Sequence, residues 1–293
     1  MKKILLMIVF TFCIFQMVVM ATPWEVDTAV YADKSKLVSS QETTPYGVAF
    51  SSDGTKMYIV GNTNDTVYQY TLSTGWDVST ATYADKSKLV GSQETNPYGV
   101  AFSSDGTKMY MVGNTNDTVY QYTLSTAWDV STATYAEKSY HETQEATPYG
   151  IAFSSDGTKM YIVGYTTDTV FQYTLSTAWD VSTATYVNKS KLVSSQDTTP
   201  LGVAFSSDGT KMYIVGNATN TVYQYALSTA WDVSTATYAN KYKAVSSQDT
   251  STPDVAFSSD GTKMYIMGYT TDTVFQYTLP APTGNALFFG TNF

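Results

Sequence analysis

A stretch of about fourteen residues recurs along this chain and constrains its fold more than any other feature. It reads Pro-Tyr-Gly-Val-Ala-Phe-Ser-Ser-Asp-Gly-Thr-Lys-Met-Tyr at Pro45–Tyr58 and returns almost unchanged at 97–110, 148–161 and 200–213, with a more divergent copy ending at Tyr265. The copies of its Ser-Ser-Asp-Gly core follow one another at steps of 52, 51, 52 and 52 residues. A regular period of this length indicates a repeat architecture.

Each repeat contains four segments that are typical of short β-strands. The first segment is apolar, the third is rich in β-branched and aromatic residues, and Ser-Asp-Gly-Thr between the first two suits a tight hairpin. In the first repeat the expected strands are 46–51, 56–60, 66–72 and 78–84, and a polar link at 85–96 leads to the next copy. Four antiparallel strands repeated radially describe a propeller blade. The sequence therefore predicts an all-β, five-bladed β-propeller of four-stranded antiparallel blades.

The two ends of the repeat array are complementary. Trp24–Tyr31 matches the fourth-strand segment Trp76–Tyr83, whereas the fifth copy stops after its third strand, at Leu279. We expect the N-terminal strand to pair into the last blade and close the ring, which removes two open sheet edges. The alternative is donation of this strand to a neighbouring molecule.

Both termini differ from the repeats. Residues 1–21 combine a basic start, an apolar run and a small residue, Ala21, and predict a signal peptide. We expect the propeller to span 22–280 and an apolar tail to span 281–293. The predicted location is secreted, extracellular or at the cell surface, with the periplasm as an alternative, and without membrane insertion of the mature form.

The charged residues exclude several classes of ligand. The chain has a net charge of −9 and no arginine, since all sixteen basic residues are lysines. Proteins that bind phosphates usually present a basic groove with arginine side chains. We therefore expect no nucleic acid, phosphorylated ligand or anionic membrane as a partner. The one cysteine, Cys13, lies in the signal peptide, and we expect no cofactor.

The second turn of each repeat and the inter-blade link vary most, and both lie on one face of an up-and-down propeller. Each second turn carries Tyr or Asn, with Asp or Asn three residues later, and tyrosines stand near the start of three inner strands. Aromatic faces and fixed polar oxygens of this kind suit a sugar. The alternative is that these residues are purely structural. The candidate ligand-binding residues are Asn62, Asp65, Asn114, Asp117, Tyr165, Asp168, Asn217, Asn220, Tyr269, Asp272, Tyr46, Tyr98 and Tyr149.

Support for catalysis or metal binding is weak in the sequence. His141 is the only histidine, and Asp254 is the only acid on an expected inner strand, whereas glycosidases use a pair of carboxylates. We interpret Asp254 as a break in symmetry at the channel mouth. Asp53 and its equivalents fit hairpin turns better than calcium sites. The tryptophan series, for example Trp76, is expected to pack between the outer parts of adjacent blades. No catalytic residue and no metal site are predicted.

The repeat motif resembles that of a known group. Pro45–Val60 resembles the blade motif of bacterial secreted propellers of the YVTN and lactonase-like kind, which cover surfaces or bind ligands. The resemblance covers about residues 24–279 and implies the fold rather than a function. Five blades are also similar to tachylectin-type lectins, in count and symmetry alone.

Together these features predict a non-catalytic secreted binding module that recognises glycan or another neutral surface, such as a surface protein. The alternative is a structural, self-assembling surface or fibre protein that forms a homo-oligomer or filament through Ala286–Phe293 or by strand exchange. A hydrolase ranks third.

Overall fold

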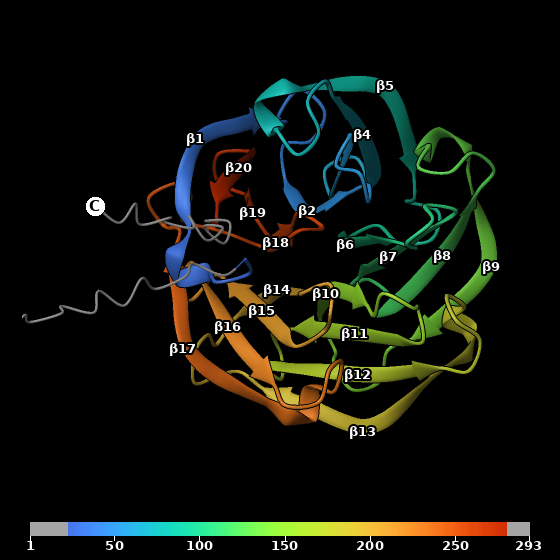
Figure 1. The fold of residues 1–293 in the computed structure, drawn as a ribbon. Coiled ribbons are helices and arrows are strands. Elements are labelled where there is room, and N and C mark those ends of the chain that lie inside the picture. The colour runs from blue at the N-terminus through green and yellow to red at the C-terminus, as the bar shows by residue number, and fades with distance from the viewer. Residues whose placement is uncertain (1–22, 280–293) are drawn as a thin grey trace, which may run out of the picture.

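Five four-stranded antiparallel sheets surround a central channel in the computed structural model, which describes residues 23–279 (Figure 1). The predicted all-β, five-bladed propeller is confirmed. In each blade the first strand of the repeat lies at the channel and the fourth at the rim. The predicted signal peptide and apolar tail lie outside the described residues, so the domain boundaries stay a prediction. Among the residues described, no helix is long and apolar enough to cross a membrane.

The blades follow the repeats. The first blade contains β2 (Pro45–Phe50), β3 (Lys56–Gly61), β4 (Thr66–Leu72) and β5 (Ala81–Leu89). The next three blades contain β6 (Pro97–Phe102), β7 (Lys108–Gly113), β8 (Thr118–Leu124) and β9 (Ala133–His141); β10 (Pro148–Phe153), β11 (Lys159–Gly164), β12 (Thr169–Leu175) and β13 (Ala184–Leu192); and β14 (Pro200–Phe205), β15 (Lys211–Gly216), β16 (Thr221–Leu227) and β17 (Ala236–Ala244). The fifth blade contains β18 (Asp254–Phe257), β19 (Lys263–Gly268), β20 (Thr273–Thr278) and β1 (Val30–Leu37).

The fourth strand differs from the expectation of 78–84. A 3₁₀ turn, η2 (Val78–Thr80), comes first, because the Asp77 carboxylate accepts a hydrogen bond from the Ser79 amide and caps it. Strand β5 then continues to Leu89, through residues expected to be a link. It passes a bulge at Asp85, whose φ is +54°, and this bulge restores pairing with β4. Equivalent 3₁₀ turns are η1 (Val26–Thr28), η3 (Val130–Thr132), η4 (Val181–Thr183) and η5 (Val233–Thr235).

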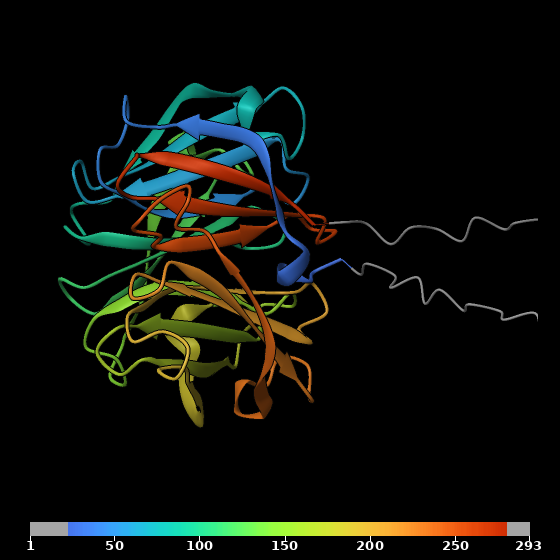
Figure 2. The ribbon, with the colours of Figure 1, turned by 90° about the vertical axis from the view of Figure 1, so that its left-hand side faces the viewer.

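The N-terminal strand closes the ring within one chain, as predicted. Strand β1 pairs antiparallel with β20, and the two lie side by side in Figure 2. The Trp24 amide donates to the Gly261 carbonyl at 3.0 Å. The Tyr213 hydroxyl of the fourth blade donates to the Trp24 carbonyl at 2.7 Å. The strand is therefore bonded both within the fifth blade and to the fourth.

The tryptophans do pack between blades, but beside the end of the channel rather than at the outer rim. The Trp76 ring stacks on Tyr265 of the fifth blade at 6.3 Å and contacts Phe50 of its own blade at 5.5 Å. The Tyr265 hydroxyl donates to the Trp76 carbonyl at 2.8 Å. The same arrangement recurs around the ring, so each seam carries one aromatic cluster.

A ring of ion pairs joins the outer strands. Lys34 contacts Asp77 at 2.5 Å, and the contact recurs at the other seams. At the seam between the fourth and fifth blades, Lys241 contacts Glu25 at 2.5 Å. The lysines are partly exposed, so each pair contributes at most about 1 kcal/mol. The apolar seams therefore dominate stability.

Close approach of neighbouring inner strands requires glycine at one position. A Cβ on Gly47 would lie 2.6 Å from the carbonyl oxygen of Tyr98 in the next blade. Gly99 and Gly150 face the following blade in the same way, at 2.5 Å. The width of the channel thus depends on these glycines.

We predict that Gly47→Ala destabilises the protein by about 1–3 kcal/mol, because the added methyl group forces the first two blades apart. Gly75→Ala is the matched control, since three other blades carry Ala there, at Ala127, Ala178 and Ala230. Urea unfolding followed by tryptophan fluorescence measures both. Equal midpoints for the two variants would contradict this role of Gly47.

Candidate functional site

The inner strands all run in the same direction along the channel, so its two ends differ in chemistry. Tyr46, Tyr98 and Tyr149 lie where these strands begin, at what we call the tyrosine end. Phe50 and Ser51 lie where the first strand ends, at what we call the serine end. Each end holds a cavity.

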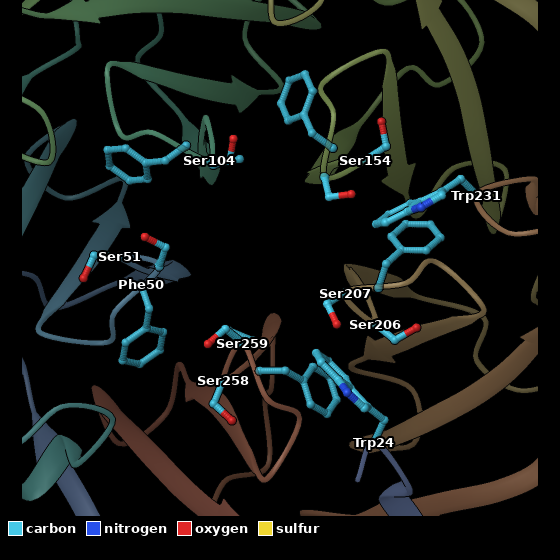
Figure 3. A pocket seen from close by; sticks show the side chains of 18 of the residues that line it. Trp24, Phe50, Ser51, Ser104, Ser154, Ser206, Ser207, Trp231, Ser258 and Ser259 are labelled. Carbon is cyan, nitrogen blue, oxygen red and sulfur yellow. The ribbon is translucent and has the colours of Figure 1, made fainter.

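The serine end has the larger cavity, of about 360 Å³. Figure 3 shows serines from several blades, among them Ser104, Ser207 and Ser259, around its open centre. Phenylalanine and tryptophan rings complete the wall, and the residues that line it include no titratable side chain. None of these lining residues is an acid, a base or a histidine that could activate a serine hydroxyl.

The aspartates beside the serine end act as turn residues. The Asp53 carboxylate accepts hydrogen bonds from the Ser51 hydroxyl at 2.6 Å and the Thr55 amide at 3.0 Å. These bonds lower the pKa of Asp53 to about 2. Asp105 and Asp156 have the same partners and the same lowered pKa. Within residues 23–279, no group of three or more His, Cys, Asp or Glu side chains could hold a metal ion.

The tyrosine end has a cavity of about 270 Å³ that lies over the fourth blade. There the inner strand carries Leu201 instead of tyrosine, and the second turn carries Asn217. Tyr165 of the third blade and Tyr269 of the fifth stand on either side, and Tyr165 is 46% exposed. The full lining is Tyr46, Tyr149, Tyr165, Thr199, Leu201, Asn217, Ser251 and Tyr269. The departures of individual blades from fivefold symmetry thus create this pocket.

Buried carboxylates in the inter-blade links hold the turns that carry these tyrosines. Glu145 accepts hydrogen bonds from the amides of Thr166 at 3.1 Å and Thr167 at 3.1 Å, next to Tyr165. Asp249 accepts a hydrogen bond from the amide of Thr271 at 2.8 Å, next to Tyr269. The second turns are therefore rigid supports rather than loose loops.

Asp254 lies beneath this pocket. A hollow of about 10 Å³, close to the space that one water molecule needs, is lined by Asp254 together with Tyr46, Tyr98 and Tyr149. The hollow and the pocket share Tyr46, Tyr149 and Leu201, so they adjoin. Asp254 occupies the place that glycine has in the other four blades, for example Gly47. Its Cβ is the only one at this position in the ring.

Burial raises the pKa of Asp254 to about 7, although two backbone hydrogen bonds act in the opposite direction. The Val48 amide donates to Oδ2 at 2.9 Å, and the Val255 amide donates to Oδ1 at 2.8 Å. The side chain keeps some exposure because it faces the channel, yet protein surrounds it and no described cation pairs with it. A carboxyl group with this pKa can exchange protons near neutral pH.

The tyrosine side chains lie close enough to shift one another's pKa. Tyr149 and Asn114 both act on the phenol of Tyr98. Tyr269 acts on the phenol of Tyr46. The rings of Tyr98 and Tyr149 stack in parallel, 4.1 Å apart. Burial raises the phenol pKa of Tyr46, Tyr98 and Tyr149, so these groups stay protonated.

Six of the sequence-predicted site residues therefore meet around the pocket and the adjoining hollow. The pocket and the hollow bring together Tyr46, Tyr98, Tyr149, Tyr165, Asn217 and Tyr269. Asn114 contacts this group through Tyr98. Their role in ligand binding stays a prediction.

The remaining candidates lie apart from the pocket and have structural contacts. Asn62 accepts a hydrogen bond from the Thr44 hydroxyl at 2.6 Å. Asp65 adopts a φ of +48°, and its carbonyl accepts from the Val90 amide at 2.8 Å. The same backbone role falls to Asp117, Asp168, Asn220 and Asp272. These residues join the second turn to the end of an outer strand.

Sequence reasoning missed Thr199, Leu201 and Ser251 in the pocket wall, and it gave Asp254 no chemical role. A signal was present in the repeats themselves. Asp254 replaces the glycine of the other four blades, and Leu201 replaces the tyrosine of the first three. His141, the other residue considered for catalysis, lies exposed at the end of the outer strand β9.

Comparison with known proteins gives one family match. The sequence model of the family described as "Lactonase, 7-bladed beta-propeller" matches residues 130–291, just over half of the chain. No curated protein is similar enough to count as a match.

Several solved structures resemble the fold. They include a periplasmic gluconolactonase of Pseudomonas aeruginosa (13% identity, 81% of this chain and 71% of that one, TM-score 0.49) and a putative 6-phosphogluconolactonase of Bacteroides uniformis (17%, 76% and 63%, 0.49). A functionally unknown protein of Desulfotomaculum acetoxidans is also similar (14%, 76% and 62%, 0.47). The chain spans less than two thirds of the length of the last two. At these identities the likeness concerns the fold alone.

The family match corrects the functional expectations. The prediction of a non-catalytic, carbohydrate-binding module was wrong, and so was the self-assembling alternative, because the matched family is named for an enzyme activity. The expectation that the protein is not an enzyme is wrong for the same reason. The family match favours the hydrolase, which the sequence analysis ranked third. A hydrolase was ranked third because the expected inner strands carry one acid, Asp254, and no second.

We predict that Asp254 makes stability fall as the pH rises from 4 to 8. Its folded pKa, about 7, exceeds the ordinary value, so the folded state holds the proton more tightly. This stabilisation is complete below about pH 4 and is lost as the pH rises through 7. It amounts to at most about 4 kcal/mol of unfolding free energy, because a pKa difference of one corresponds to about 1.4 kcal/mol.

Urea unfolding of wild type and Asp254→Gly at several pH values tests this expectation. As the pH increases, the free energy of unfolding of wild type should fall relative to that of the variant. A difference that does not depend on pH would contradict the raised pKa.

Proposed function

The chain belongs to the seven-bladed lactonase β-propeller family, although its own ring has five blades, and we propose that it hydrolyses lactones at the tyrosine end of its channel. The observation that carries the proposal is Asp254, a carboxyl group with a pKa of about 7 beside a water-sized hollow under an aromatic pocket. A pocket with converging polar groups and a perturbed pKa is a strong candidate for an active site.

Asp254 acts as the general base. Its ionised carboxylate takes a proton from a water molecule in the hollow while the water oxygen attacks the lactone carbonyl carbon. A base of this pKa is about half ionised at neutral pH and still basic enough to accept a proton. The hollow fixes the distance between water and carboxylate, which removes much of the entropic cost of bringing them together.

Asn217 is placed to stabilise the oxyanion that follows. Its Oδ1 accepts a hydrogen bond from the Thr252 amide at 2.9 Å, which orients the side chain and leaves its NH₂ group as the donor end. Asn217 lines the pocket. A donor held in advance where negative charge develops lowers the barrier to acyl transfer.

Collapse of the tetrahedral intermediate breaks the ring C–O bond. Asp254, protonated in the first step, returns its proton to the departing alkoxide oxygen. The product is a hydroxy acid, whose carboxyl group is ionised at neutral pH. Its carboxylate is repelled by the regenerated Asp254 and by a chain of net charge −9, which favours release.

The lining residues restrict the substrate class. No lysine lines the pocket or the hollow, and the chain has no arginine. A phosphorylated lactone would therefore find no counter-charge. The pocket, of about 270 Å³, suits a small lactone without phosphate.

Export from the cytoplasm is part of the proposal. Residues 1–21 have the pattern of a signal peptide, and a propeller without cysteine beyond Cys13 needs no particular redox conditions. The substrate would then be met outside the cytoplasm.

We predict that Asp254→Gly lowers kcat/KM for δ-valerolactone about 100-fold or more, since general-base catalysis contributes that much. Glycine is the residue of the other four blades, so the variant should fold. Tyr242→Ser is the control: Tyr242 lies 57% exposed on the outer strand, where the other blades carry serine. Acid release followed at constant pH measures the rate. Equal rates in wild type and Asp254→Gly would sink the assignment.

We also predict that wild-type kcat/KM rises with pH and levels off above about pH 7, because only the ionised carboxylate accepts the proton. The profile is measured between pH 5 and 8.5, with the uncatalysed rate subtracted. A rate that is constant across this range would rule out Asp254 as the base.

A further inference from the structure

The pocket is walled by tyrosine rings that are inclined to one another. We call Tyr46, Tyr149, Tyr165 and Tyr269 the tyrosine cage. Tyr46 makes an angle of 54° with Tyr149 and 46° with Tyr269, at centroid distances of 6.0 and 5.1 Å. Tyr165 stands at 76° to Tyr149, 6.1 Å away. The four rings therefore turn their faces in different directions around one space.

This arrangement differs from a slot for a flat neutral ring. A planar ligand is best held between two parallel aromatic faces. The parallel pair near this pocket, Tyr98 and Tyr149, is stacked on itself at 4.1 Å and leaves no room between its members. Inclined rings around a compact space are instead how proteins bind ammonium groups, because each ring face carries partial negative charge.

The charge around the cage has the matching sign. Asp254, at the floor, is the only residue lining the pocket or the hollow that can carry a negative charge near neutral pH, and none of the lining residues is basic. The chain as a whole carries −9. A cation is thus attracted both by the overall field and by the site.

The positions of the tyrosines in the repeats support a specific role. Tyr165 and Tyr269 occupy a turn position where the other three blades carry Asn62, Asn114 and Asn217. Both stand beside the fourth blade, where Leu201 opens the space. The scaffold is stable with asparagine at this position, so hairpin geometry alone does not require tyrosine there.

We propose that the tyrosine cage binds an ammonium group, so that the preferred substrates are lactones with a cationic substituent. The substrate preference rests on the function proposed above, whereas the binding of an ammonium group does not. The ammonium group lies against the rings of the cage, and the lactone carbonyl then points toward the hollow. Bound in this way, the cation also favours the ionised form of Asp254.

The binding test needs no catalysis. Choline and its neutral isostere 3,3-dimethyl-1-butanol have the same shape and differ in charge, and calorimetric titration at pH 8 compares them. We expect choline to bind at least about tenfold more tightly. Equal affinities, or no binding of either compound, would overturn the proposal.

Variants taken from the protein's own repeats locate the site. Tyr165→Asn combined with Tyr269→Asn should reduce the affinity ratio of the two compounds to about one, whereas Tyr242→Ser should leave it unchanged. A ratio that survives the double variant would place the cation elsewhere and refute the cage.

The pH dependence adds a separate readout. The titratable groups that face Asp254 are the phenols of Tyr46, Tyr98 and Tyr149, which stay protonated. The affinity for choline should therefore rise about tenfold or less between pH 6 and pH 8 in wild type, and should not change in Asp254→Gly. A pH effect of the same size in both proteins would contradict the role of Asp254.

Hydrolysis is tested with a second matched pair, α-trimethylammonio-γ-butyrolactone and α-tert-butyl-γ-butyrolactone. The ratio of their kcat/KM values should be at least about tenfold higher in wild type than in the double tyrosine variant, a comparison that cancels their intrinsic reactivities. Selective choline binding without any lactone hydrolysis would refute the proposed function and leave the cage standing. Hydrolysis of both lactones with the same ratio in wild type and in the double variant would support the proposed function and refute the cage.

Discussion

The close approach of five inner strands around one channel is the constraint on which the rest of the structure depends. Glycine at one position in four of the five blades lets each strand approach the next, with hypothetical Cβ contacts of 2.5–2.6 Å at Gly47, Gly99 and Gly150. A side chain at this position lies against the backbone of the next blade. The fifth blade has Asp254 there, and its carboxylate reaches the Val48 amide of the first blade. The same packing that forms the ring thus buries one ionisable group without a counter-ion and raises its pKa.

Closure by the N-terminal strand preserves this geometry. Strand β1 completes the fifth blade, so the first and fifth blades meet at a seam like the others, with stacked aromatic rings and a lysine–carboxylate pair. Asp254 spans that same seam through its bond to Val48. A propeller left open here would lose the burial that perturbs Asp254. Fold and candidate chemistry are therefore linked at one interface.

Much of the fold could be predicted from the sequence, because the spacing of the motif copies gives the number of blades and the two end segments together complete one repeat. The start of the fourth strand could not, since the Asp77 cap and the bulge at Asp85 depend on side-chain geometry within the folded blade. The candidate site was only partly predictable. Its tyrosines were identified, but the convergence of residues from four blades over Leu201 depends on the ring. The functional class was predicted wrongly because the repeat motif is specific for the fold and not for a function.

The ionisation of the Asp254 carboxyl group decides whether this residue can act as the base. Its titration can be followed by ¹³C NMR of protein labelled at the aspartate carboxyl carbons, with the spectrum of Asp254→Gly identifying the signal. We expect a midpoint near pH 7. A midpoint near the ordinary aspartate value of about 4 would show that the channel leaves this group unperturbed, and would contradict its role as the base.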